Sequence, residues 1–320
     1  MRRQRLRRLG RRPAMRIALV FGVLAGLAWL VDPYAVAVRL GRVEPGPVLW
    51  AVLLVQCQII ASAERWRLTA AALGQTLTRR QAVAEYYVAS LLNQLLPGGV
   101  SGDVVRAWRN RSDQDDSRGW AVPVQAIMIE RLAGQVVLGL IGLLGLLAWL
   151  CVDGSRIHGA GVLLAGTAAV FAGLALGMTL LARWAPTRLA AFAASFGPAL
   201  RAAWFRSGRW AGQGLLSLLI VASYLIAFAL ASQAVGAPLP PIAVAALVPL
   251  VLLSMLLPIS VAGWGMREAA AAALWPLAGA SAADGIAASV LYGLVSLIGA
   301  LPGALWIARG RGHAQPVRRA

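Results

Sequence analysis

Long apolar runs that recur from one end of the chain to the other constrain its fold most. A helix of roughly 20 apolar residues crosses the hydrocarbon core of a bilayer. With 59% hydrophobic and only 13% charged side chains, this 320-residue chain holds more apolar material than one soluble core needs. We therefore predict an all-α polytopic membrane protein with about six full spans, at about 17–31, 48–68, 122–150, 159–182, 213–235 and 285–307.

These spans define one transmembrane domain, residues 17–310, between a basic N-terminus at 1–16 and a basic tail at 311–320. All 30 positively charged side chains are arginines, and they gather in alternate connecting segments, as the positive-inside rule describes. We therefore predict that both termini are cytoplasmic, and that the net charge of +18 faces anionic lipid headgroups rather than nucleic acid. The Arg-rich start also resembles a secretory signal peptide, but an uncleaved first span gives the self-consistent topology.

Reactive side chains are sparse and scattered. Cys57 and Cys151 lie in or beside apolar spans, while His158 and His313 are far apart in the sequence. The sequence therefore suggests neither a disulfide framework nor a metal site. It contains no lysine, which excludes Schiff-base chemistry, and no arrangement of groups suited to an intramembrane enzyme. We expect no catalytic residues and no cofactor.

One sequence pattern occurs twice, as LLNQLLPGGVSGDVVR at 91–106 and as LLSMLLPISVAGWGMR at 252–267. Eight of the sixteen positions are identical without a gap, at an offset of 161 residues. The same offset carries two other predicted spans onto spans that were assigned independently. We interpret the chain as duplicated, with halves at about 48–150 and 209–310.

Each copy of the pattern interrupts an apolar segment at a proline, Pro97 or Pro258, before a full span is complete. Such segments are typical of re-entrant hairpins, whose irregular backbone must be shielded by protein or by a wet cavity. The arginine distribution makes the first hairpin, 81–109, enter from the cytoplasm and the second, 241–276, from outside, so the repeats are inverted. This arrangement points to a substrate site at the midplane. The alternative is that both prolines kink ordinary spans, giving eight spans and parallel repeats.

The helix that restarts after each proline has free N–H groups and a positive dipole end, which favour an anion. Small residues there allow a phosphate to approach, and arginines at matched repeat positions supply bidentate donors. An aspartate three positions before the first arginine is placed to pair with it. We predict a lipid-headgroup site formed by Arg106, Arg267, Asp103, Gly98, Gly99, Gly102 and Gly263. The structural alternatives are a turn for the glycines and an interfacial anchor for Arg106.

Two charged residues, Glu130 and Arg131, lie inside an apolar run, where charges are costly and usually face a cavity or a partner. Either they form structural ion pairs with another helix, or Glu130 couples protons and Arg131 completes the anion site. Glu268 is a further candidate for coupling or ion pairing, although we expect it to point away from its neighbour Arg267. The ERWR run at 64–67 is interpreted as an interfacial anchor with a local ion pair.

Four segments together resemble one known family: ERWR at 64–67, LLPGGVSGDVVR at 95–106, ERL at 130–132 and PISVAGWGMRE at 258–268. In this order they are similar to the transmembrane region of lysylphosphatidylglycerol synthases and their stand-alone, flippase-like relatives, over about residues 15–310. The resemblance implies a bacterial or archaeal plasma-membrane protein that translocates aminoacylated or other anionic lipids; some relatives are linked to polyprenyl-phosphate sugars or hopanoids. Bifunctional members continue into an aminoacyl-transfer domain, whereas this chain ends at Ala320, so we expect no synthase activity.

Two functions fit these features. The first is a flippase or scramblase that passes an anionic or zwitterionic lipid headgroup through the midplane site, for a phospholipid, an aminoacyl-phospholipid or a polyprenyl phosphate. The second is a non-transporting accessory subunit for a glycosyltransferase or a lipid-modifying enzyme. Transport of a small soluble solute is also compatible, because an inverted repeat specifies architecture rather than substrate. The expected partners are membrane lipids, and the oligomeric state is left open.

Overall fold

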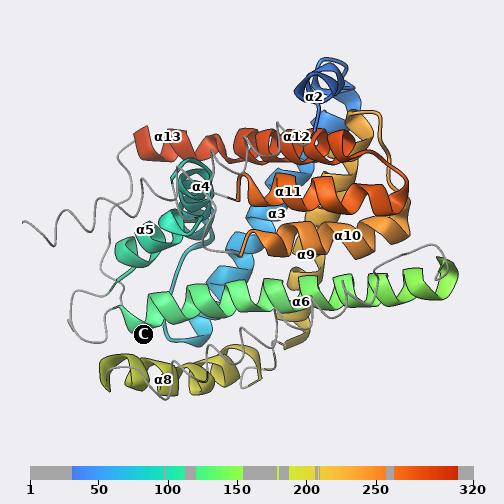
Figure 1. The fold of residues 1–320 in the computed structure, drawn as a ribbon. Helices are drawn as coiled ribbons and strands as arrows, with labels where there is room; N and C mark the ends of the chain where they lie inside the picture. Colours follow the sequence, from blue (N-terminus) through green and yellow to red (C-terminus); the bar gives the residue numbers. More distant parts are fainter. Residues whose placement is uncertain are drawn as a thin grey trace, which may run out of the picture.

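The computed structural model describes residues 31–96, 99–111, 120–153, 179, 187–205, 208, 210–256 and 263–308, with the backbone alone at 153 and 187–190. These residues form helices joined by turns and short connections (Figure 1). The predicted spans at 17–31 and 159–182 lie almost wholly outside the described residues. Three residues of the predicted site, Pro97, Gly98 and Pro258, also lie outside them.

Four helical segments in the described part of the chain are long and apolar enough to cross a membrane. Each coincides within a few residues with a span that the sequence predicted, which confirms a polytopic all-α membrane protein. They are α3 (Pro45–Ala72), α6 (Ala121–Asp153), α9 (Trp210–Ala234) and α12 (Ala282–Ala300), which continues into α13 (Pro302–Ala308).

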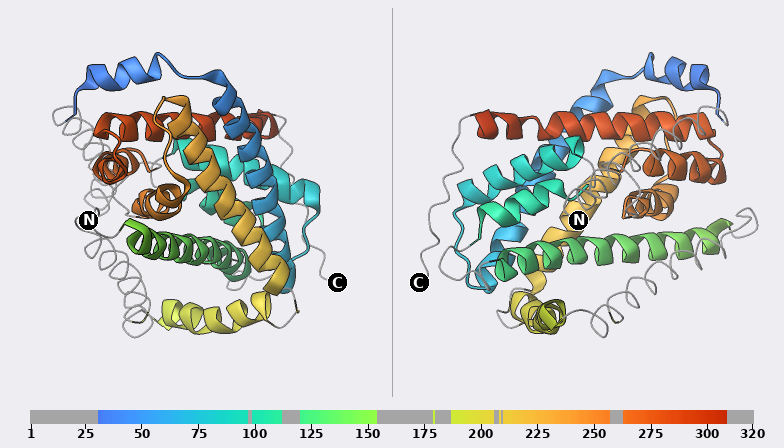
Figure 2. Two further views of the ribbon diagram at one scale, coloured as in Figure 1. Left: turned by 90° about the vertical axis from the view of Figure 1, so that its right-hand side faces the viewer. Right: turned by 60° about the vertical axis from the view of Figure 1, so that its left-hand side comes forward.

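The spanning helices share one apolar core. The helices α3 and α9 run side by side along much of their length (Figure 2), and α12 packs against both. In this core the ring of Phe228 stacks on Tyr292 with centroids 4.7 Å apart and meets Trp275 at 5.4 Å. Such aromatic contacts add to the energy of area burial, so they fix α9 against the C-terminal helices.

Each copy of the repeated pattern forms a pair of short helices. The first hairpin consists of α4 (Arg79–Leu95) and α5 (Ser101–Arg109), and the second of α10 (Pro241–Ser254) and α11 (Met266–Leu274), which runs into the 3-10 helix η1 (Trp275–Ala278). The nine residues of α5 or α11 make a helix about 14 Å long, less than half the roughly 30 Å of a hydrocarbon core. Neither helix crosses a bilayer by itself.

The arms of each hairpin pack side by side, which favours re-entrant hairpins over two kinked spans; re-entry into the membrane stays a prediction. The side-chain oxygen of Asn93 accepts a hydrogen bond from the backbone N–H of Gly102 at 2.8 Å. Only a glycine fits at position 102, because a Cβ there would lie 2.0 Å from the carbonyl oxygen of Ala89 in α4. In the second hairpin the hydroxyl of Ser254, which matches Asn93 in the repeat, lies 2.6 Å from the carbonyl oxygen of Val251 in its own helix and 3.3 Å from that of Met266 in α11. A polar residue before each proline position thus lies within hydrogen-bonding distance of the other arm.

The two hairpins contact opposite ends of the in-line helices α12 and α13. The second hairpin packs through α11 on α12, whereas the first packs through α4 on α13. In Figure 1 α4 and α5 accordingly lie on one side of the molecule and α10 and α11 on the other. This placement is the one expected of inverted repeats; entry of the hairpins from opposite membrane faces stays a prediction.

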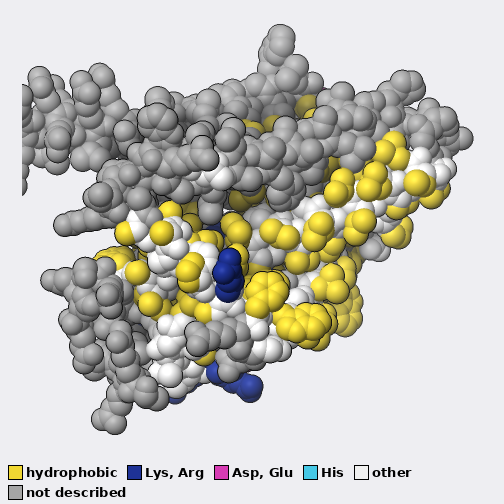
Figure 3. All heavy atoms as spheres, turned by 90° about the horizontal axis from the view of Figure 1, so that it is seen from below, with side chains coloured by type: hydrophobic (Ala, Val, Ile, Leu, Met, Phe, Trp, Pro, Cys, Tyr) yellow, Lys and Arg dark blue, Asp and Glu magenta, His cyan; other side chains and the backbone are white. Residues whose placement is uncertain are grey.

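Two further helices flank this frame, α2 (Pro33–Leu40) and α8 (Thr187–Trp204). The helix α2 packs against α12, where the guanidinium of Arg39 forms an ion pair with Asp284. On the outer surface large apolar side chains stand exposed, among them Leu144 at 63% and Leu215 at 58%. The described part of the face in Figure 3 is mostly hydrophobic, with isolated basic side chains. Such a surface is suited to lipid rather than water.

Candidate functional site

A cavity of about 470 Å³ lies between the ends of the two hairpins. We call these ends the first tip (93–96 and 99–100) and the second tip (252–256 and 263–265). Both tips contribute to the wall, and the rest comes from the hairpin helices α4, α5 and α11 and from the spanning helices α3, α6, α9 and α12. The lining therefore comes from both halves of the repeat, as predicted for a site at the repeat interface, and includes Gln58, Asn93, Gly99, Asp103, Glu130, Arg131, Tyr224, Gly263 and Arg267.

Glu130 of α6 is the centre of a buried ionic cluster at one side of the cavity. Its carboxylate accepts hydrogen bonds from Arg65 of α3 at 3.2 Å and from Arg106 of α5 at 3.1 Å. The hydroxyl of Tyr86 in α4 donates a third, at 2.7 Å. Because a buried charge is tolerated only when it is paired and hydrogen-bonded, this cluster holds the first hairpin against α3 and α6. Glu130 thus forms the ion pairs that its structural interpretation expects, and proton coupling by Glu130 stays a prediction.

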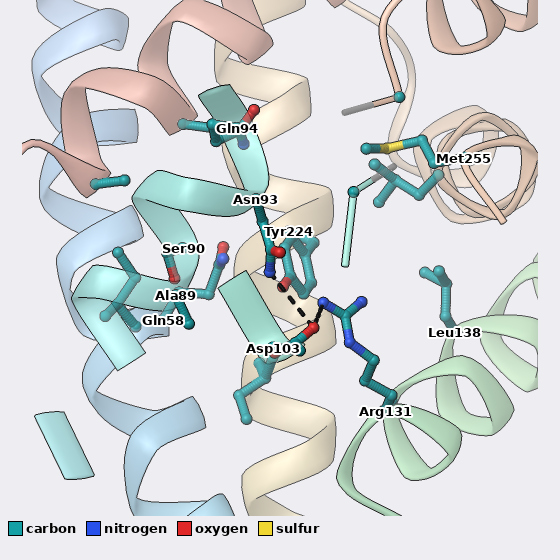
Figure 4. Close-up of a pocket in the computed structure, with 18 of the residues that line it drawn as sticks. Gln58, Ala89, Ser90, Asn93, Gln94, Asp103, Arg131, Leu138, Tyr224 and Met255 are labelled. Atoms are coloured by element: carbon teal, nitrogen blue, oxygen red, sulfur yellow. Dashed lines mark hydrogen bonds and ion pairs between the residues drawn. The ribbon is translucent and has the colours of Figure 1, made fainter. Parts of the chain in front are cut away.

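Asp103 extends this cluster to the cavity wall. Its carboxylate lies 2.9 Å from Nη2 of Arg106, which is the pair predicted from their spacing, and it also pairs with Arg131 of α6. The amide of Asn93 donates to the same carboxylate at 3.4 Å. In Figure 4 the guanidinium of Arg131 points at Asp103, with Asn93 and Tyr224 beside them. The side chain of Arg131 is 41% exposed and lines the cavity.

A second, smaller cluster surrounds Arg267 of α11. Its Nη2 lies 2.8 Å from Glu268, and its Nε donates to Ser289 of α12 at 2.9 Å. The guanidinium lies over the rings of Trp264 and Tyr292, at 4.9 and 5.4 Å from their centroids. Arg267 is fully buried, yet its Nη1 has no hydrogen-bond partner among the described residues. Arg267 therefore lines the cavity with one buried donor that has no partner among the described residues.

The two arginines at matching positions of the repeat, Arg106 and Arg267, have different surroundings in the structure. Arg267 lines the cavity, whereas Arg106 lies behind the wall, between the rings of Trp66 and Tyr86, each centroid 4.6 Å away. With Asp103 and Glu130 as further partners, Arg106 is a structural cation that positions the site. Gly102 is also behind the wall, where it allows α5 to approach α4. Gly99 and Gly263 do line the cavity.

Glu268 differs from the expectation that it would point away from Arg267. Its carboxylate pairs with Arg267 and also accepts a hydrogen bond from the N–H of Gly265 at 2.6 Å. The start of α11 is therefore already occupied by an anionic group of the protein. An anion bound in the cavity meets the side chain of Arg267 rather than this helix end.

Several cavity residues were not identified from the sequence. Arg65 was interpreted as part of an interfacial anchor, but its side chain is 5% exposed and donates to Ser217 of α9 at 3.0 Å. Only the Glu64–Arg67 pair, at 2.6 Å, fits that interpretation. Tyr86 and Tyr224 carried no signal beyond being polar groups within apolar segments. The clue that the sequence offered was that Arg65 lies about one turn inside the end of a predicted span.

The fold and the cavity define a polytopic helical membrane protein with two facing hairpins and an ionic internal site. The family described as the lysylphosphatidylglycerol synthase transmembrane region matches residues 15–303, and the chain belongs to this family. No curated protein matches the chain. Membership associates it with membrane proteins of lipid-related processes.

Proposed function

We propose that this protein moves the headgroup of an anionic or zwitterionic lipid between leaflets through the cavity at the hairpin tips. The observation that carries the proposal is that Arg131 and Arg267, from the two halves of the repeat, both line this cavity and both keep donor capacity. Guanidinium groups bind phosphate and carboxylate through paired hydrogen bonds. An anionic headgroup is therefore the chemistry that the cavity suits best.

Energetics and size support the same function. An unpaired charge in hydrocarbon costs several kcal/mol or more, and the cavity replaces lost water with the guanidinium groups, the amides of Gln58 and Asn93 and the hydroxyl of Tyr224. Its volume of about 470 Å³ lies within the roughly 300–1,000 Å³ typical of small-molecule sites. In this proposal the headgroup occupies the cavity while the lipid tails stay in the bilayer, and no bond of the lipid is made or broken.

A transfer assay in proteoliposomes tests the proposal. We expect the purified protein to speed the movement of a fluorescent phosphatidylglycerol between leaflets, and Arg131→Gln to slow it about tenfold or more, because one charge-assisted contact is lost. The control is Arg79→Gln, since the side chain of Arg79 is 81% exposed and remote from the cavity. Arg79→Gln should transfer lipid normally.

The same assay separates the proposal from its main alternative. If the wild-type protein alone moves no lipid, the transport function is wrong, and a non-transporting accessory role for a glycosyltransferase or lipid-modifying enzyme gains support. If Arg131→Gln and Arg79→Gln both match the wild type, transport stands but does not use this cavity. Soluble anions offered on one side, which should not cross, test for transport of a small solute.

A further inference from the structure

Among the carboxylates of the site in the described residues, Asp103 is the one that both lines the cavity and pairs with an exposed arginine, Arg131. The oxygens of Glu130 are taken by Arg65, Arg106 and Tyr86. Those of Glu268 are taken by Arg267, Ser289 and Gly265, and Glu268 does not line the cavity. Asp103, by contrast, faces Arg131, whose side chain is 41% exposed. This pair is the part of the site that a ligand can rearrange.

Formal charges in the site do not balance. Four arginines and three carboxylates gather there among the described residues, which leaves one positive charge uncompensated: Arg65, Arg106, Arg131 and Arg267 against Asp103, Glu130 and Glu268. Buried charges are stable only when they are compensated. A ligand with a single negative charge would neutralise the site, and one with two would leave a surplus of negative charge.

We propose that Asp103 sets the charge of the headgroup that the cavity accepts, and that it favours a phosphodiester over a phosphomonoester. This inference rests on the proposed function. A phosphodiester carries one negative charge, whereas a phosphomonoester carries about 1.5 to 2 at neutral pH. In the structure the carboxylate of Asp103 pairs with Arg131. An incoming phosphodiester shares that guanidinium and displaces the side chains around Arg267 enough to bind its Nη1, which is buried without a partner among the described residues. Asp103 keeps Arg106 and Asn93 as partners throughout.

The repeat itself shows that this pair is specific to one half. At the offset of 161 residues, the position of Asp103 is taken by Trp264 and that of Arg131 by Tyr292. In the second half these two residues form aromatic contacts with Arg267 instead of an ion pair. The two halves therefore present different chemistry to the cavity, an ion pair in the first half and aromatic rings around Arg267 in the second. A role of Asp103 and Arg131 in selecting the ligand fits this asymmetry.

Binding measurements on the purified full-length protein in detergent test the inference without requiring transport. The probes are two short-chain lipids, phosphatidylglycerol as the diester and phosphatidic acid as the monoester, titrated at pH 7.5. We expect the wild type to bind the diester about tenfold more tightly, and Asp103→Asn to shift the ratio of the two Kd values by at least about tenfold toward the monoester. Asp103→Glu, which retains the charge, should keep the wild-type order.

The matched control is Asp284→Asn, which removes an aspartate paired with Arg39 at the start of α12, outside the cavity lining. It changes the protein charge equally and should leave the ratio unchanged. An unchanged ratio in a folded Asp103→Asn protein, or an equal shift in Asp284→Asn, overturns the inference. If Asp103→Asn does not fold, Arg131→Gln replaces it, and unaltered affinity for both lipids in that variant overturns the inference too.

The outcome for the proposed function is separate. If the wild type binds the two lipids in the expected order but moves neither between leaflets, the charge selection by Asp103 stands and transport is wrong. If transport occurs and the binding ratio does not respond to Asp103→Asn, transport stands and the selection is wrong. Binding of neither lipid by the wild type overturns both.

Discussion

The guanidinium of Arg106 and the carboxylate of Glu130 lie 3.1 Å apart, with both side chains only 1% exposed. Arg106 belongs to the short second arm of the first hairpin, and Glu130 to the spanning helix α6. Glu130 is also bonded to Arg65 of α3. One buried carboxylate therefore joins the hairpin to two spanning helices, and the cavity wall depends on it.

Replacing Glu130 should destabilise the protein strongly. Glu130→Gln leaves Arg65 as a buried cation without a charged partner and Arg106 with Asp103 alone, and breaking a buried pair costs about 3 to 5 kcal/mol. Thermal unfolding in detergent measures the effect as a lowered midpoint. The control is Glu64→Gln, whose pair with Arg67 is about a quarter exposed, and exposed pairs contribute about 1 kcal/mol or less. Equal midpoints for the two variants would show that Glu130 is not the structural centre.

Gly102→Ala tests the close packing of the first hairpin. The added methyl group would lie 2.0 Å from the carbonyl oxygen of Ala89, so α5 must move away from α4, at a cost of about 1 to 3 kcal/mol or more. We expect a lower unfolding midpoint and weaker lipid transfer, because Asp103 is the next residue. Gly212→Ala in α9 is the control, since nothing lies within 4 Å of its added methyl group. A wild-type midpoint for Gly102→Ala would contradict the packing described here.

The orientation of the hairpins is tested by labelling from either side of the membrane. Single cysteines are introduced as Arg79→Cys, at the start of the first hairpin, and Pro238→Cys, just before the second, after Cys57 and Cys151 are replaced by alanine. Both positions are exposed. With an impermeant maleimide we expect Arg79→Cys to react from the cytoplasmic side only and Pro238→Cys from the outer side only. Reaction of both from one side would rule out inverted repeats.

The sequence predicts well what depends on local pattern. Apolar runs gave the four spans that the structure describes, because length and hydropathy suffice for that purpose. The repeat located the two pairs of short helices, because a proline followed by small residues interrupts a helix. The pair of Asp103 and Arg106 followed from a spacing of three on one helix.

The same reasoning cannot predict contacts between segments that are far apart in the sequence. Arg65 lies at the end of a predicted span, where an interfacial role is usual; it is buried because Ser217 and Glu130, 152 and 65 residues away, meet it there. Glu268 was expected to point away from Arg267, as neighbours on a regular helix do. Here Gly265, with φ at 86°, starts α11 and draws the carboxylate of Glu268 back over the first turn, within reach of Arg267.

Arg267→Lys tests whether the second tip needs the planar guanidinium of arginine or only its positive charge. The guanidinium of Arg267 contacts Glu268 through Nη2 and Ser289 through Nε and lies over two aromatic rings. Its Nη1 is buried without a partner among the described residues. A lysine ammonium is compact and cannot form this planar set of contacts. We expect the unfolding midpoint to fall, by an amount that corresponds to about 2 kcal/mol for the lost charged hydrogen bonds, and lipid transfer to fall with it. Arg79→Lys, at an exposed position, should change neither. If Arg267→Lys retains both stability and transfer, a simple positive charge suffices at the second tip, and the guanidinium geometry assigned to the headgroup site is wrong.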